Sequence, residues 1–157
     1  MKVLLIGGAP STGKSNAVCM CARYLINRGF VLLDCQDYNG QKIKLPTIVT
    51  GSSKPTDFLA RLDGTDKNNK KVSVIIASAS DTIPIIDSSF SYFQKKACDI
   101  LISSVRDINY ERKYLFSKFH FQTDDKSLME FPLAKMSRKN QNWCTAKNWC
   151  DSTVRIC

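Results

Sequence analysis

The sequence predicts a single α/β domain over residues 1–157, built in three layers from a mainly parallel sheet of about five strands with helices on both faces. Short, unbroken apolar runs alternate along the chain with segments whose apolar residues recur at helical spacing, the pattern of strands joined by crossover helices. Hydrophobic residues make up 43% of the chain. That content and length are sufficient for one core that folds without staples.

The chain opens with an expected strand, a glycine-containing loop and a helix, in that order. Residues 2–6 form an apolar run typical of a buried parallel strand, and residues 16–28 show helical periodicity up to Gly29, a helix stop. Between them, Gly8-Ala9-Pro10-Ser11-Thr12-Gly13-Lys14-Ser15 fits G-x-x-x-x-G-K-[ST]. This is the phosphate-binding loop of P-loop nucleotide hydrolases and kinases.

The chemistry of that loop explains its residue types. Gly8 and Gly13 let the backbone curl so that successive N–H groups point at a phosphate, and the positive end of the following helix adds to the field. Lys14 would contact the β- and γ-phosphates, while Ser15 would offer its hydroxyl to Mg²⁺. We therefore expect ATP and Mg²⁺ as cofactors. The nucleotide-binding residues would be Gly8, Ala9, Pro10, Ser11, Thr12, Gly13, Lys14, Ser15 and Asn16.

The remaining elements follow from periodicity and turn residues. Further strands are expected at residues 30–34, 72–77 and 99–104, with extended candidates at 47–50, 116–121 and 128–133. Helices are expected at 55–62, 83–96, 109–115 and around 143–154. In such a sheet, ligands bind beyond the carboxyl ends of the strands, so the residues after each strand are the functional candidates.

Acids and arginines follow the apolar strands. Asp34 and Asp37 come at the end of the second strand, and either could orient an acceptor hydroxyl. Arg106 and Arg112 follow the fourth strand and would neutralise the transferring charge. Asp81, after the third strand, is a candidate metal ligand together with Ser15. Asp34 is its rival for that role, and a helix cap at Asp81 or the preceding serine is the structural alternative.

Residues 2–39 resemble small P-loop kinases of the adenylylsulfate, gluconate and nucleotide kinase type, in which a second strand also ends in an acidic, substrate-facing motif. The resemblance implies a P-loop NTPase fold and an ATP- and Mg²⁺-dependent phosphotransferase acting on a small hydroxyl-bearing substrate. Here, however, Gly40-Gln41-Lys42 stands where such kinases carry an arginine. The alternative is a P-loop ATPase or nucleotide-dependent switch that binds a partner protein and has no small-molecule acceptor.

A G protein is disfavoured, because Asp37-Tyr38-Asn39-Gly40 spells D-x-x-G but no N-K-x-D or T-K-x-D sequence follows to read guanine. The formal charge of +9 favours anionic ligands. Nucleic acid is not expected as the main partner, because the charges are dispersed and residues 67–71 suit a solvated turn.

Seven cysteines without C-x-x-C spacing, and a single histidine, make a zinc site improbable and suggest a reduced, cytoplasmic protein. No apolar run reaches membrane-spanning length, and the first strand leaves no room for a signal peptide. We therefore expect a nucleotide and a small-molecule substrate as partners, and no membrane.

Overall fold

The computed structural model describes residues 1–47, 56–106 and 109–133. The pieces expected at 47–50 and 143–154 fall almost entirely outside these ranges. The strands are β1 (Lys2–Gly8), β2 (Val31–Gln36), β3 (Leu59–Thr65), β4 (Lys71–Ala77), β5 (Ile100–Val105) and β6 (Leu128–Leu133). The helices are α1 (Lys14–Asn27), α2 (Ile83–Lys95) and α3 (Tyr110–Phe119). Most of the expected elements are confirmed, with boundaries shifted by a few residues.

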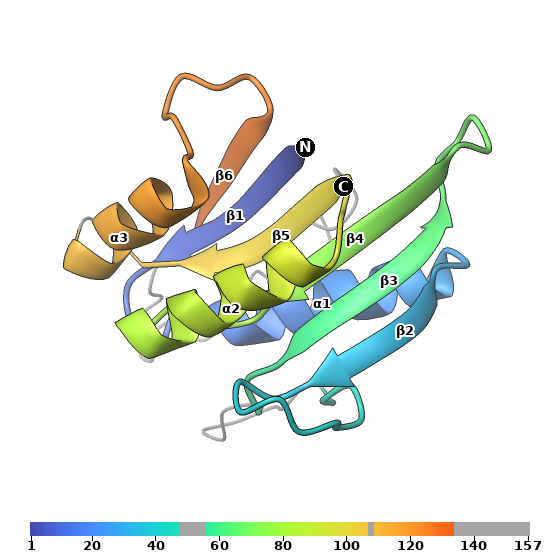
Figure 1. The fold of residues 1–157 in the computed structure, drawn as a ribbon, viewed down its shortest axis with the longest axis horizontal. Coiled ribbons are helices and arrows are strands. Elements are labelled where there is room, and N and C mark those ends of the chain that lie inside the picture. Colours follow the sequence, from blue (N-terminus) through green and yellow to red (C-terminus); the bar gives the residue numbers. More distant parts are fainter. Residues whose placement is uncertain (48–55, 107–108, 134–157) are drawn as a thin grey trace, which may run out of the picture.

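The six strands form one sheet in the order β2-β3-β4-β5-β1-β6 (Figure 1). The β4–β5, β5–β1 and β1–β6 pairs are parallel, whereas β3 is antiparallel to both of its neighbours. A mainly parallel sheet is confirmed, with six strands in place of the expected five or so. Because β3 runs backwards, its first residue, Leu59, pairs with the last residue of β4, Ala77. The chain entering β3 therefore lies at the edge where the parallel strands end.

The helix expected at residues 55–62 is wrong, because β3 begins within that range. The run Leu-Ala-Arg-Leu has good helix propensity, but propensity is a weak prior that tertiary pairing can override. In the extended chain, Ala60 and Leu62 face the same side of the sheet and are completely buried, while the intervening Arg61 points to the other face. Pairing with β2 on one side and β4 on the other stabilises this arrangement.

A tight turn joins β3 to β4 and contains the expected lysine cluster. The carboxylate of Asp66 accepts hydrogen bonds from the backbone N–H groups of Asn68 at 2.8 Å and Lys70 at 3.0 Å. Residues 67–70 are exposed. The interpretation of this cluster as a solvated turn before a strand is confirmed.

The extended segment expected at residues 116–121 is also wrong in its first part, since α3 continues to Phe119. Phe116 and Phe119 are three residues apart, a spacing that places them on one face of a helix but on opposite faces of a strand. The helix ends at His120, which adopts a left-handed conformation (φ 56°), and Phe121 N–H then donates to the carbonyl of Phe116 at 2.9 Å. The aromatic residues therefore form the last turn of α3 and the hydrogen-bonded turn that ends it.

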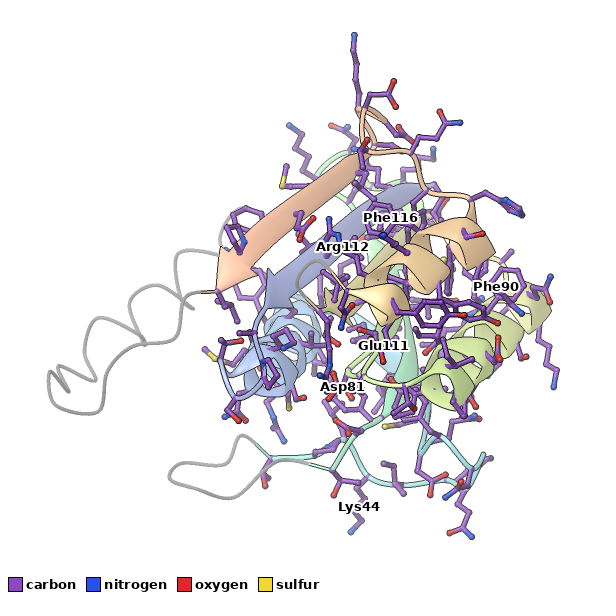
Figure 2. The ribbon with its side chains drawn as sticks, turned by 90° about the vertical axis from the view of Figure 1, so that its left-hand side faces the viewer. Lys44, Asp81, Phe90, Glu111, Arg112 and Phe116 are labelled. Carbon is purple, nitrogen blue, oxygen red and sulfur yellow. The ribbon has the colours of Figure 1, made fainter. Side chains whose placement is uncertain are left out.

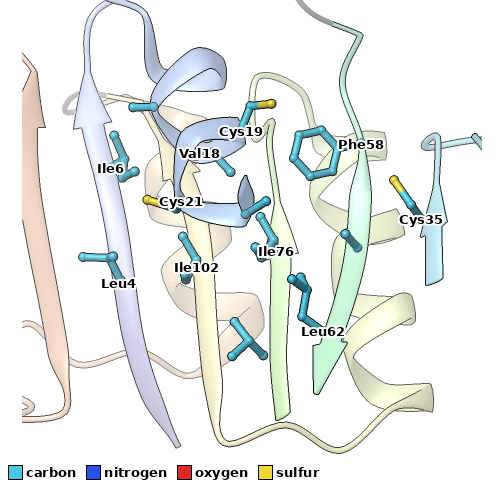
Figure 3. Close-up of a cluster of buried hydrophobic side chains, with 14 residues drawn as sticks. Leu4, Ile6, Val18, Cys19, Cys21, Cys35, Phe58, Leu62, Ile76 and Ile102 are labelled. Carbon is cyan, nitrogen blue, oxygen red and sulfur yellow. The ribbon is translucent and has the colours of Figure 1, made fainter. Parts of the chain in front are cut away.

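The sheet lies between two helical layers. Helix α1 covers one face, while α2 and α3 cover the other (Figure 1). Beneath α1, buried side chains that include Ile6, Ile76 and Ile102 pack against Val18 of the helix (Figure 3). None of the three helices combines the length and apolar character that crossing a membrane requires.

Candidate functional site

The loop between β1 and α1 has the backbone form that the motif predicts. Gly8 (φ 149°), Ser11 (φ 63°) and Gly13 (φ 90°) all have positive φ. A Cβ on Gly8 would lie 2.7 Å from the carbonyl oxygen of Leu133 in β6, so only glycine fits there. The Thr12 hydroxyl donates to the Ala9 carbonyl at 2.9 Å and closes the loop on itself. The loop therefore has a defined, internally hydrogen-bonded backbone.

Lys14 is the first residue of α1, and its side chain turns back along the loop. Its Nζ donates to the carbonyl oxygens of Gly8 at 2.7 Å and Ala9 at 2.8 Å, and the residue is only 8% exposed. A cation is therefore held against the loop, next to the positive end of a 14-residue helix. An ammonium group beside the N-terminus of a helix is an arrangement that can attract an anion.

Ser15, the next residue, lies close to a carboxylate that sequence reasoning missed. Its Oγ is 3.4 Å from Oδ1 of Asp57, which stands two residues before β3. Asp57 reaches the loop because β3 runs antiparallel and begins at the carboxyl edge of the sheet. The wrong prediction of a helix at 55–62 hid this role of Asp57. A prediction that this segment forms a hairpin with β4 would have placed Asp57 at the carboxyl edge of the sheet.

Asp81 and Arg106 form an ion pair at the carboxyl ends of β4 and β5. Arg106 Nε donates to Asp81 Oδ1 at 3.1 Å, and this hydrogen bond raises the pKa of Arg106. Asp81 does not cap α2, since the N-cap residue is Thr82. Asp81 lies near the start of α2 (Figure 2). Arg106 follows β5, which is the neighbour of β1 in the sheet.

Arg112 makes a bidentate ion pair with Glu130 of β6, with both N–O distances at 2.7 Å. The guanidinium also lies over the Phe116 ring, 4.7 Å from its centre. Glu130 in turn covers Gly7, where a Cβ would come within 2.5 Å of its Oε1. Arg112, the second arginine predicted for the site, is thus joined by an ion pair to β6, the strand that pairs with β1.

The structure does not bring Asp34 to this site. Asp34 lies inside β2, where Lys96 and the Tyr92 hydroxyl (3.0 Å) donate to its carboxylate. The hydrogen bond from Lys96, helped by that from Tyr92, holds the pKa of Asp34 below its ordinary value despite burial. Three strands separate β2 from β1, a distance of about 19 Å at the usual strand spacing.

Asp37 follows β2 and organises a turn. Its Oδ1 accepts hydrogen bonds from the backbone N–H groups of Asn39 and Gln41, both at 2.9 Å. The carboxylate of Asp37, the first residue of the D-x-x-G sequence, therefore makes hydrogen bonds within its own turn. The next residue, Tyr38, crosses to the loop after β4, where its hydroxyl accepts from Ala79 N–H at 2.9 Å and donates to Ala79 C=O at 3.0 Å.

Among the described residues, no three or more histidine, cysteine, aspartate or glutamate side chains group together to hold a metal ion. No family model matches the chain, and no similar curated protein or solved structure was found.

Proposed function

We propose that the chain is a P-loop NTPase that binds Mg·ATP at residues 8–16 and transfers its terminal phosphoryl group to a small hydroxyl-bearing substrate. The observation that carries this proposal is the position of Lys14, whose ammonium is held against the loop carbonyls at the N-terminus of α1. The loop amides, the helix dipole and the Lys14 ammonium would together supply positive charge that stabilises a bound polyphosphate.

The contact between Ser15 and Asp57 fits a magnesium ion. At 3.4 Å, the two oxygens are too far apart for a good O–H···O hydrogen bond. Adjacent ligands of an octahedral Mg²⁺, each about 2.1 Å from the metal, lie about 3 Å apart, so a small adjustment would let both oxygens bind one ion. Magnesium would complete its shell with phosphate oxygens and water, as it usually does. We therefore assign the metal role to Asp57 with Ser15, in place of Asp81.

We reassign the role of orienting the acceptor hydroxyl, for which the sequence had suggested Asp34 or Asp37. Asp81 is the carboxylate near the loop that could orient a substrate hydroxyl, and Arg106 beside it could neutralise charge on the transferring group. Asp34 is supported only as a structural residue, because Lys96 and Tyr92 occupy its carboxylate. Substrate would therefore enter between the starts of α1 and α2.

The second candidate is a P-loop ATPase that acts as a nucleotide-dependent switch for a partner protein. It is favoured by the ion pairs of Arg106 with Asp81 and of Arg112 with Glu130, because both arginines expected to contact phosphate are already engaged by acids. Breaking such pairs when nucleotide binds would change the surface around the site. A cytoplasmic location suits both candidates, and Cys19, Cys35 and Cys98 carry the free thiols expected there.

ATP turnover, measured with and without a pool of hydroxyl-bearing metabolites, tests the proposal. A kinase shows turnover that rises sharply with one metabolite, whereas a switch is indifferent to all of them. Lys14→Ala should abolish nucleotide binding in a protein that still folds, and Lys113→Ala, at an exposed lysine of α3, is the matched control. Normal ATP binding by folded Lys14→Ala protein would refute the nucleotide site itself.

A further inference from the structure

Two buried serine hydroxyls at the carboxyl edge of the sheet have no hydrogen-bond partner within the described part of the chain: Ser80 Oγ and Ser104 Oγ. The residues are 2% and 1% exposed. Buried polar groups are almost always hydrogen-bonded, because leaving one unpaired costs stability. An unpaired buried hydroxyl therefore needs an explanation, and a missing ligand is one.

Neighbouring serines show that the environment does not simply tolerate unpaired hydroxyls. Ser78 Oγ accepts from the Phe58 N–H at 2.7 Å, and Ser103 Oγ donates to the Ser104 carbonyl at 3.1 Å. Both of these serines are as deeply buried as the unpaired two. The contrast sets Ser80 and Ser104 apart.

Strand alternation gives the direction of Ser104. Ile102, two residues earlier in β5, packs in the cluster beneath α1, so Ser104 faces the same helix. Ser104 is in register with Ile6 of β1, two residues before the phosphate loop begins at Gly8. Ser104 therefore lies on the α1 face of the sheet, close to the end of β1 that leads into the loop.

The order of strands relates both serines to the candidate site. Asp57 stands before β3, Ser80 lies in the loop after β4, Ser104 is the second-last residue of β5, and the loop of residues 8–15 follows β1; these strands are consecutive in the sheet. Ser15 nevertheless reaches Asp57, because α1 packs across β1, β5 and β4. In the order of the strands, the two serines thus lie between the loop and Asp57.

We propose that Ser80 and Ser104 form a subsite whose hydroxyls donate to the terminal phosphate of a nucleoside triphosphate. The inference rests on the proposed nucleotide-binding function and deepens it by naming the residues that distinguish a triphosphate from a diphosphate. Phosphate oxygens are strong acceptors, and the cation between Ser15 and Asp57 would draw the terminal phosphate to this side of the loop.

The test compares Ser80→Ala and Ser104→Ala with Ser103→Ala, the adjacent buried serine whose hydroxyl is already engaged. Melting temperature without ligand, and dissociation constants for Mg·ATP and Mg·ADP by calorimetry, are measured for each full-length variant. We expect Ser80→Ala and Ser104→Ala to melt no lower than wild type, since each change removes an unpaired group. Each should bind Mg·ATP about tenfold more weakly, with Mg·ADP changed by less than about twofold.

Ser103→Ala should show the opposite pattern, with a lower melting temperature and an unchanged preference for ATP over ADP. Equal weakening of ATP and ADP, or no weakening of either, in Ser80→Ala and Ser104→Ala would overturn the subsite while leaving the nucleotide site intact. Failure of the wild type to bind either nucleotide would overturn the proposed function and the subsite with it. Lys14→Ala is included in the same series, because nucleotide binding that remains in this variant occurs outside the loop.

Discussion

At the scale of single residues, Asp57 and Asp81 are the two candidates for the proposed metal ligand, and substitution of each leads to a different expected result. Asp57→Asn should raise the Mg²⁺ concentration needed for nucleotide binding by about tenfold or more, because a carboxylate ligand is lost. Asp81→Asn should leave that concentration almost unchanged and lower turnover, because Asp81 pairs with Arg106 and not with Ser15. Magnesium titrations of nucleotide affinity separate the two. A weakened metal response in Asp81→Asn alone would return the metal role to Asp81.

A second residue-scale prediction concerns acid stability. The pKa of Asp34 is lowered in the folded protein, chiefly by the hydrogen bond from Lys96, so its stabilising contribution is complete above the unfolded pKa of about 4. That contribution is lost as the pH falls through the lower, folded value. Asp34→Asn should therefore reduce the free energy of unfolding by about 1 kcal/mol at pH 7 and by less at pH 2–3.

Urea unfolding of Asp34→Asn, Lys96→Met and the double variant across this pH range measures the coupling directly. The pair interacts only while Asp34 is ionised, so the coupling free energy should vanish in acid. A coupling free energy that does not fall as the pH is lowered would contradict the ion-pair account. Nucleotide affinity should be unchanged in Asp34→Asn, since β2 lies far from the loop.

At the scale of elements, the ion pair of Glu130 and Arg112 links β6 and α3 beside the loop of residues 8–15. Glu130 of β6 covers Gly7 of β1 while it binds Arg112 of α3. Gly7→Ala should displace the Glu130 carboxylate, break the bidentate pair and lower the free energy of unfolding by about 0.5–1 kcal/mol. In a Glu130→Ala background, the same change should cost less than about 0.5 kcal/mol, because the obstructing side chain is gone. Equal costs in both backgrounds, measured by urea unfolding, would show that backbone contacts reject the Cβ.

At the scale of the whole molecule, nucleotide binding should be visible as stabilisation of the entire fold. A ligand present at a hundred times its dissociation constant raises the free energy of unfolding by about 2.7 kcal/mol. Mg·ATP should raise the melting temperature at least as much as Mg·GTP, because the sequence has no guanine-reading motif and its D-x-x-G forms a hydrogen-bonded turn. A consistently larger shift with GTP in thermal melts would revive the G-protein hypothesis.

Features that depend on neighbours along the chain could be predicted from the amino-acid sequence. The apolar runs of β1, β4 and β5, the helical periodicity of α1 and α2, and the loop of residues 8–15 all follow from local spacing and residue type. In these segments, propensity, burial pattern and turn residues agree. The role proposed for Lys14 likewise needs only its place between a strand and a helix.

Contacts between residues far apart in the chain became known from the fold alone. The hairpin of β3 and β4 overrode the helix propensity of residues 59–62 and brought Asp57 to Ser15. Strand order placed Asp34 at the far side of the sheet, where Lys96 holds it. Both outcomes depend on pairings between segments far apart in the chain. Local periodicity carries no information about such pairings, because it records which face of an element is apolar and not which partner covers it.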